Sequence, residues 1–309
     1  MNNRLAAFIA LILIIVTATT LYFNIFSSSD QNSKKDFTLI VLPDIGGYVL
    51  NYPWIFENQT QWITQNIEKL NIVFVSQLGD LVSNGDNITQ WEIANQSMSK
   101  LDDKIPWATL PGNHDVYYGN STNYETFFGS NRFKNQNWYG GTYKPNSNSN
   151  SYQLFSAGGD NYIIFHIQYK PTDDILFWTK NVIDQYPDRR VIISTHDYIN
   201  GPFNSNQRSE IGERIWYNLI KQYSNRIFLV LCGHANTQNK IIDKVGTNTV
   251  YQLLADYQNS TNIESGWLRI LEFIPAQNKI VVKTYSPYLK RYKIDPYNLF
   301  TLEYNMTGN

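Results

Sequence analysis

Short apolar runs alternate with segments of helical periodicity along the first two thirds of the chain. Residues 38–42 and 72–78 are apolar runs bounded by Pro or Gly, which is typical of buried strands. Between them, residues 54–70 carry apolar side chains at the spacing of an amphipathic helix. Further strands are expected at 107–110, 190–195 and 227–232, and further helices at 88–101, 174–185 and 211–223. This alternation predicts an α/β fold with polar motifs at the carboxyl ends of strands.

Antiparallel strands are expected in the other segments. Residues 152–156 and 162–169 flank the turn sequence AGGD at 157–160, which predicts a hairpin. Residues 129–151 are rich in Gly, Asn and Ser, so we expect a long surface loop there. After residue 240 the alternating pattern predicts strands at 250–254, 268–273 and 280–285.

The chain opens with a long apolar segment. Arg4 precedes a stretch from Leu5 to Phe23 that is apolar apart from three threonines and one tyrosine. We interpret residues 1–26 as a signal peptide or an uncleaved signal-anchor, because a buried core helix would not be apolar all round. Residues 27–36 are then a polar spacer before a domain at 37–309. This interpretation places the domain outside the cytoplasm, secreted or anchored to the membrane.

Composition excludes several classes of protein. The chain has 309 residues, of which 42% are apolar and 15% aromatic, so it can fill a core and is not a disordered chain. The formal net charge of -1 argues against nucleic acid as the main partner. The single cysteine, Cys232, excludes a disulfide framework, and its apolar neighbours indicate an inert core position.

Five polar motifs each follow an expected strand. Carboxylate, amide and imidazole groups that meet at one sheet edge are suitable ligands for a divalent metal ion. Three of the four histidines fall in these motifs, whereas His166 lies in an apolar strand and is expected to be structural. The motifs are PDIG at 43–46, GD at 79–80, GNHD at 112–115, THD at 195–197 and GHAN at 233–236.

The order of these motifs resembles the calcineurin-like metallophosphoesterase family over roughly residues 37–240. The flanking sequence is similar to the subgroup that has a D-x-Q type of first motif. The resemblance implies a four-layer α-β-β-α sandwich of two mixed sheets, with residues 241–309 as its β-rich C-terminal part. It also implies a phosphorylated substrate, whose identity the sequence leaves open, as it does the oligomeric state.

Motif by motif, the resemblance implies a centre for divalent metal ions. Asp80 would be the carboxylate that bridges two metals, and Asp44 would belong to the first metal. The second metal's ligands would be completed by Asn113, His196 and His234. Such a ligand set suits Mn, Fe or Zn, with one ion held tightly and a second held weakly if at all.

The resemblance also implies the chemistry of the site. Hydroxide formed from metal-bound water would attack phosphorus, with Asp80 as bridging ligand. His114 would stand beside the metals without binding them, and would stabilise or protonate the leaving-group oxygen. Asp115 and Asp197 follow ligands directly and are expected to support them, rather than to bind metal.

Three positions depart from the family pattern. Gly46 stands where a His or Gln ligand is expected, and Asn236 stands where the last His of the GHxH motif is expected. The first metal site therefore keeps Asp44, Asp80 and the carbonyl group of Asn236. Ser83 replaces an Asp that often orients the catalytic histidine, so we expect that histidine to be a poorer acid.

Three functions are compatible with the motifs that match the family and the three positions that depart from it. The favoured one is an active extracytoplasmic phosphoesterase. The second is a catalytically degenerate module that binds a metal or a phospho-ligand on the same fold, and the third is an adhesion or surface protein. No arginine lies inside a motif, so Arg208 and Arg214 are the nearest candidates for contacts with a phosphate group.

Overall fold

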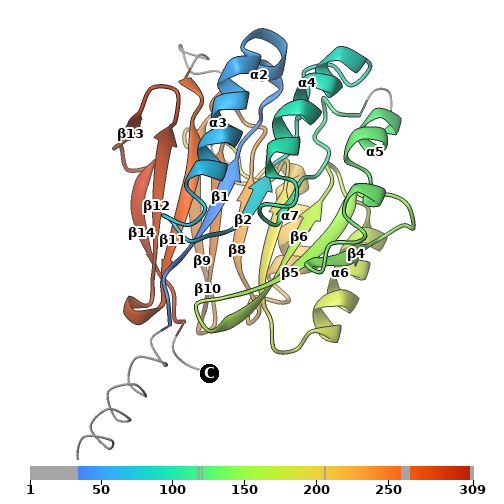
Figure 1. Ribbon diagram of the computed structural model, residues 1–309. Coiled ribbons are helices and arrows are strands. Elements are labelled where there is room, and N and C mark those ends of the chain that lie inside the picture. The colour runs from blue at the N-terminus through green and yellow to red at the C-terminus, as the bar shows by residue number, and fades with distance from the viewer. Residues whose placement is uncertain (1–33, 117–118, 120, 205–206, 259–264, 307–309) are drawn as a thin grey trace, which may run out of the picture. The chain divides into compact units, whose positions relative to one another are not determined.

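Seven strands make up the first sheet of the structure (Figure 1). They are β1 (Phe37–Leu42), β2 (Ile72–Gln77), β3 (Trp107–Ala108), β11 (Leu268–Ile274), β12 (Lys279–Ser286), β13 (Arg291–Lys293) and β14 (Leu299–Glu303). Their order is β13-β12-β11-β1-β2-β3, with β14 paired to β12. β1, β2 and β3 are parallel, whereas β11 runs antiparallel to β1, so the sheet is mixed.

The second sheet also has seven strands and is also mixed. They are β4 (Tyr139–Thr142), β5 (Asn150–Ala157), β6 (Asp160–Ile167), β7 (Arg190–Thr195), β8 (Ile227–Cys232), β9 (Gln238–Val245) and β10 (Asn248–Ala255). Their order is β4-β5-β6-β7-β8-β10-β9. β6, β7, β8 and β10 are parallel, and antiparallel strands close both ends.

This computed structural model describes residues 34–116, 119, 121–204, 207–258 and 265–306. Both sheets belong to the unit Asp36–Asn309. The signal or signal-anchor expected at residues 1–26, and most of the spacer at 27–36, lie outside the described residues. Within the described ranges, no helix has the length and apolar character needed to cross a bilayer.

Helices cover the outer faces of both sheets. On the first sheet these are α2 (Gly46–Asn51), α3 (Pro53–Gln65), α4 (Ile88–Met98) and α5 (Thr122–Phe128). On the second they are α6 (Asp173–Gln185) and α7 (Glu210–Ile215), which continues into a π-helical turn over Trp216–Ile220. The expected four-layer α-β-β-α sandwich is therefore confirmed.

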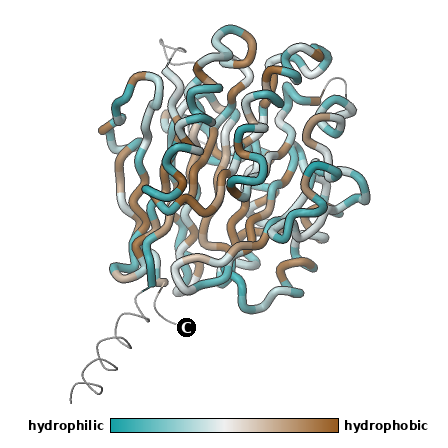
Figure 2. The backbone as a smooth tube through the Cα atoms, viewed as in Figure 1, coloured by the Kyte–Doolittle hydropathy of each residue, from teal (hydrophilic) through white to brown (hydrophobic). Residues whose placement is uncertain are grey.

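The alternation of side chains along β1 shows how the layers form. Leu39 and Val41 point into the core between the two sheets, whereas Ile40 and Leu42 pack under the helices of the first sheet. Because both faces of the strand are covered, the run is apolar throughout, as the hydropathy colours of Figure 2 show for the central strands.

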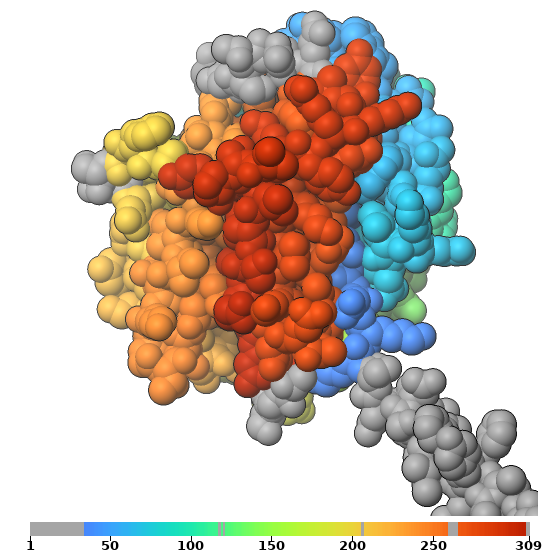
Figure 3. All heavy atoms as spheres, turned by 90° about the vertical axis from the view of Figure 1, so that its left-hand side faces the viewer, coloured from blue at the N-terminus to red at the C-terminus, as the bar shows by residue number. Residues whose placement is uncertain are grey.

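The C-terminal strands complete both sheets. The strands expected at 250–254, 268–273 and 280–285 are confirmed as β10, β11 and β12, and β9, β13 and β14 are additional. Figure 3 shows the side of the molecule where β12 to β14 (red) lie beside β9 and β10 (orange). Lys240 Nζ there donates to the carbonyl oxygen of Pro296, at 3.0 Å.

The prediction of a long surface loop at 129–151 is wrong in part. β4 lies within this segment, and the last four residues of the Asn/Ser run, 148–151, are buried, with Asn148 fully enclosed. The reason is a carboxylate: Glu125 of α5 accepts hydrogen bonds from the hydroxyls of Ser147 and Ser149 and from the backbone N–H of Asn148. Buried polar groups are tolerated where they are bonded in this way.

The hairpin expected at 157–160 is confirmed, with β5 and β6 joined through Gly158 and Gly159, both at positive φ. The helix expected at 54–70 is α3, which ends at Gln65, five residues before the expected end. The helix expected at 211–223 is α7 with the π-helical turn that follows it.

Parallel strands of both sheets end at the same edge, and each polar motif follows one of them.

Candidate metal centre

Asp80 is held by a tight turn after β2. Gly79 has φ +93° and Asp80 itself has φ +53°, a left-handed conformation that is costly for a residue with a side chain. The buried amide of Gln77 stabilises the turn, since it donates to the carbonyl of Gly79 at 2.7 Å and accepts from the N–H of Gly79 at 2.9 Å. The carbonyl of Asp80 also accepts the N–H groups of Ile45 and Gly46, which joins the first two motifs.

The loop after β3 closes over Asp80. The N–H of His114 donates to Asp80 Oδ1 at 2.9 Å. Asp115 shapes this loop, because its carboxylate accepts from Gly112 N at 2.8 Å and from Val82 N at 3.1 Å. A Cβ atom on Gly112 would collide with the Asp80 carboxylate, so only glycine allows this approach.

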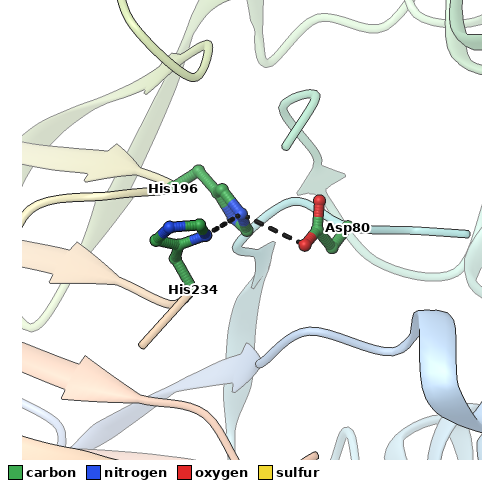
Figure 4. Close-up of side chains that lie close together, drawn as sticks. All are labelled: Asp80, His196 and His234. Carbon is green, nitrogen blue, oxygen red and sulfur yellow. Dashed lines mark hydrogen bonds and ion pairs between the residues drawn. The ribbon is translucent and has the colours of Figure 1, made fainter. Parts of the chain in front are cut away.

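One imidazole nitrogen lies among three atoms that can bind metal. His196 Nε2, at the end of β7, lies 3.2 Å from Asp80 Oδ2, 2.9 Å from Asn113 Oδ1 and 3.2 Å from His234 Nδ1. Figure 4 shows Asp80, His196 and His234 pointing toward one another. The ligand atoms of these three side chains all lie within 4.8 Å of one another. His196 Nδ1 lies 2.9 Å from the carbonyl oxygen of Leu78, which fixes the ring.

The loop after β8 brings His234 against Asp44. The N–H of His234 donates to Asp44 Oδ2 at 3.1 Å, while Asp44 Oδ1 is buried with no hydrogen-bond partner among the described residues. His234 and Asn236 both have positive φ. The N–H of Asn236 donates to a carboxylate that follows β10, Asp256, at 2.8 Å.

The site concentrates negative charge around His196. Burial opposes protonation of this ring, but the Asp80 carboxylate outweighs burial and raises its pKa to about 9. Conversely, the charge of His196 lowers the pKa of Asp80 in spite of burial. Burial, with the charge of His196, lowers the pKa of His234. Burial, with the neighbouring carboxylates of Asp256 and Asp80, raises the pKa of Asp44.

These residues fit a divalent metal ion. Two imidazoles, an amide oxygen and a carboxylate meet at one point, and such mixed N/O donor sets suit Mn, Fe or Zn. Buried carboxylates are costly unless a positive charge neutralises them. Oδ1 of Asp44 is the second observation, because it is a buried carboxylate oxygen without a hydrogen bond, 3.8 Å from His196 Nδ1, with a lone pair to donate.

The structure explains the three departures. A Cβ on Gly46 would lie 2.7 Å from the backbone of Val82, so this position has no space for a ligand side chain. Asn236 engages the site's surroundings through its backbone N–H. Ser83 orients His114 after all, since its carbonyl oxygen lies 3.0 Å from His114 Nδ1. The backbone, rather than a side chain, therefore positions this ring.

Other candidates have roles elsewhere. Arg208 bonds to Gln252 and to Asp243, and Arg214 pairs with Asp173, so neither arginine is placed for a phosphate group. His166 is fully buried, 2.9 Å from Ser76 Oγ and 2.7 Å from Gln153 Oε1, which agrees with the structural role expected for it.

The supporting carboxylates and the thiol occupy the expected surroundings. Asp197 Oδ2 lies 4.0 Å from His234 Nε2. Burial and the charge of Asp80 raise the pKa of Asp115 to about 7. Cys232 is buried, and burial raises the pKa of its thiol, which makes it a poor nucleophile.

Three residues near the centre were missed by sequence reasoning. The ring of Tyr169 lies 5.7 Å from that of His234, and Lys170 Nζ lies 5.0 Å from the Tyr169 ring. Asp256 is fully buried beside Asp44. A signal for Asp256 was present, because it follows a buried apolar strand as the five motifs do.

Comparison with known proteins identifies the family of this chain. The chain belongs to the calcineurin-like phosphoesterase family, whose model matches residues 37–238. It is 37% identical over 268 residues to an uncharacterized protein of Bacillus subtilis, YvnB, with 84% of this chain covered. This chain spans only 20% of the length of that relative.

Two solved structures share the fold. The purple acid phosphatase PPD1 of yellow lupin has a TM-score of 0.59 and 14% identity, covering 88% of this chain and 54% of its own. GAP50 of Plasmodium, described as the anchor in the inner membrane complex, has a TM-score of 0.57 and 14% identity, covering 88% of this chain and 90% of its own. The same architecture therefore occurs in a phosphatase and in an anchor.

Proposed function

We propose that this chain is a metal-dependent phosphoesterase whose centre is Asp80, Asn113, His196 and His234. The observation that carries this proposal is the position of His196 Nε2, which faces oxygen or nitrogen atoms of the other three side chains at 2.9 to 3.2 Å. A divalent ion bound there supplies the positive charge that activates water and neutralises phosphoryl oxygens.

The residues around the ion have separate roles in the proposed reaction. Asp80 presents Oδ2 to the centre while Oδ1 is held by His114 N. His114 Nδ1 donates to the carbonyl of Ser83, so in the protonated ring the second N–H, at Nε2, is the one offered to a leaving-group oxygen. General acid catalysis by His114 then needs no contact with the metal.

Lys170 is our candidate for binding the substrate's phosphoryl group. Its ammonium group is exposed beside Tyr169, whose ring lies 5.9 Å from that of His196. A cation at the mouth of the site attracts an anionic ester and complements its oxygens. The substrate class stays open between phosphate monoesters and diesters.

A degenerate binding module is the second candidate function. It is favoured by one observation, the depletion of the first metal site at Gly46 and Asn236. A protein with one tightly bound ion and no turnover would have this function, as the occurrence of the fold in an anchor illustrates.

We further propose that the domain works outside the cytoplasm. The support is the apolar segment between Arg4 and Phe23, which has the composition of a signal peptide or signal-anchor. Fractionation of cells that express the full chain, with protease added to intact cells, tests this location. Protection from the protease until the membrane is broken would overturn it.

Hydrolysis of two chromogenic esters tests the activity. The purified full chain with Mn²⁺ is expected to hydrolyse p-nitrophenyl phosphate or bis(p-nitrophenyl) phosphate, and the faster of the two identifies the class. His196→Ala should abolish the rate, because it removes the nitrogen at the middle of the site. If the wild type binds Mn²⁺ and hydrolyses neither ester, the degenerate module is the better account.

A further inference from the structure

The buried carboxylate of Asp44 has one oxygen without a hydrogen bond. Asp44 is 2% exposed, and only its Oδ2 has a hydrogen bond, from the N–H of His234. Oδ1 has no hydrogen-bond partner among the described residues, and a Cβ atom on Gly233 would collide with it. A buried carboxylate oxygen without a hydrogen bond is costly, so this atom is available to bind a cation.

A second buried carboxylate lies beside this atom. Asp256 is 0% exposed and follows β10, which runs parallel to β8 with Leu254 opposite Cys232. Both strands therefore end at the edge where Asp44 follows β1. The two carboxylates bind the same short segment, because Asp44 accepts from His234 N and Asp256 from Asn236 N.

Asp256 still has capacity to bind an ion. Its Oδ1 accepts from Gln258 N at 3.0 Å and its Oδ2 from Asn236 N at 2.8 Å. Each carboxylate oxygen has a second lone pair, so both can bind a cation while they keep these bonds. The two N–H groups also fix the orientation of the carboxylate, as supporting hydrogen bonds do for known metal ligands.

Charge favours a cation at this place. Asp256 is close enough to Asp44 for its charge to act on that group more strongly than Asp80 does. Three carboxylates are thus gathered in a buried volume around one imidazole, that of His196, whose Nε2 lies 3.2 Å from Asp80 Oδ2 and whose Nδ1 lies 3.8 Å from Asp44 Oδ1. Oxygen-rich sites of this kind suit hard ions such as Mn²⁺ or Mg²⁺.

We propose that Asp256 is a ligand of the first metal ion and, with Asp44 and Asp80, replaces the side chains that Gly46 and Asn236 do not supply. This inference rests on the proposed function, since it assumes a second ion bound at Asp80, His196 and His234. It makes the protein a two-metal centre with an unequal pair of sites, one rich in nitrogen and one rich in oxygen.

Metal binding, measured without any substrate, tests the inference. We would titrate the full chain with Mn²⁺ and count bound and free ions by electron paramagnetic resonance. The wild type is expected to bind one ion tightly, at Asp80, His196 and His234, and another more weakly, at the first metal site. Asp256→Asn should weaken the ion at the first metal site by about 10- to 100-fold and leave the tightly bound ion unchanged.

The matched control is Asp160→Asn, which removes a carboxylate from the start of β6 at the opposite edge of the same sheet. It should bind both ions as the wild type does. In the Asp256→Asn background, Asn236→His should recover part of the affinity for the ion at the first metal site. Asp256→Glu keeps the buried charge, and by displacing the carboxylate it should also weaken that ion.

The results separate the two proposals. Wild-type binding of both ions by folded Asp256→Asn or Asp256→Glu overturns the inference. Loss of both ions in Asp256→Asn also overturns it, because Asp256 would then only hold the His234 loop. A wild type that binds one ion and hydrolyses ester overturns the inference and leaves the proposed function intact. A wild type that binds no ion overturns both.

Discussion

The backbone carbonyl oxygen of Ser83 lies 3.0 Å from Nδ1 of His114. This relationship orients the imidazole although the carboxylate expected at position 83 is absent. A main-chain acceptor does not depend on the side chain of the residue that carries it. The loss of Asp at this position therefore does not remove the orientation on which proton transfer depends.

Substitutions at these two positions should differ sharply. His114→Asn is expected to lower kcat by about 10²- to 10⁴-fold, because it removes the general acid. Ser83→Ala should stay within a few-fold of the wild type, since the carbonyl remains. Steady-state kinetics with a chromogenic ester measures both, and bound metal should be equal in all three proteins. A large loss in Ser83→Ala with a small loss in His114→Asn would contradict this assignment.

The two depleted ligand positions should respond differently to a restored histidine. Asn236→His is expected to raise occupancy of the first metal site, because it supplies an imidazole where the family has one. Gly46→His should lower the melting temperature without raising occupancy, since its Cβ would lie 2.7 Å from the backbone of Val82. Mn²⁺ titration with thermal unfolding tests the pair. An unchanged affinity for the more weakly bound Mn²⁺ in Asn236→His would contradict this expectation.

Lys170 should affect substrate binding and not the metal. Lys170→Met keeps most of the apolar stem but removes the charge, so KM should rise about ten-fold, the cost of one lost charge-assisted hydrogen bond. Lys180→Met, which removes a partly exposed lysine of α6 bonded to Gln222, is the control and should leave KM unchanged. Equal KM values in both variants would exclude Lys170 from the site.

His166 should make stability depend on pH in the acid range. Burial lowers the pKa of this ring to about 3, whereas an unfolded chain has a value of about 6.5. The unfolded state therefore binds the proton more tightly, and this contribution is fully present above about pH 6.5 and lost as pH falls toward 3. The expected slope is about 1.4 kcal/mol per pH unit.

His166→Gln removes the titrating group and keeps hydrogen-bonding atoms for Ser76 and Gln153. The dependence of the free energy of unfolding on pH, measured by urea denaturation between pH 4 and 6, should become shallower by about that amount. An identical slope in wild type and variant would show that His166 is not buried in its neutral form.

Local patterns were sufficient to find the residues that follow buried strands. Asp80, His196 and His234 each stand after an apolar run, and parallel strands bring such positions to one edge of the sheets. The same pattern would have identified Asp256, but the motifs of the family do not include a carboxylate after β10. The same alternation of strand and helix predicted an α/β fold, whereas the four-layer sandwich was predicted only through the resemblance to the family.

Features set by distant partners could not be read from the sequence. The burial of Asn148 depends on Glu125, which is 23 residues away in the chain. The orientation of His114 depends on a carbonyl group 31 residues away. Every residue has a backbone carbonyl, so the sequence does not indicate which one lies near the ring. The absence of space at Gly46 likewise depends on the backbone of Val82.

The most direct test of the account is the rate of ester hydrolysis as a function of bound metal. The full chain would be stripped with a chelator and reloaded with Mn²⁺ in steps, with bound ions and the rate on the preferred chromogenic ester measured in the same samples. We expect no hydrolysis by the metal-free protein and a rate that rises with occupancy of the centre at Asp80, His196 and His234. Hydrolysis that survives the chelator, or full occupancy without hydrolysis, would contradict it.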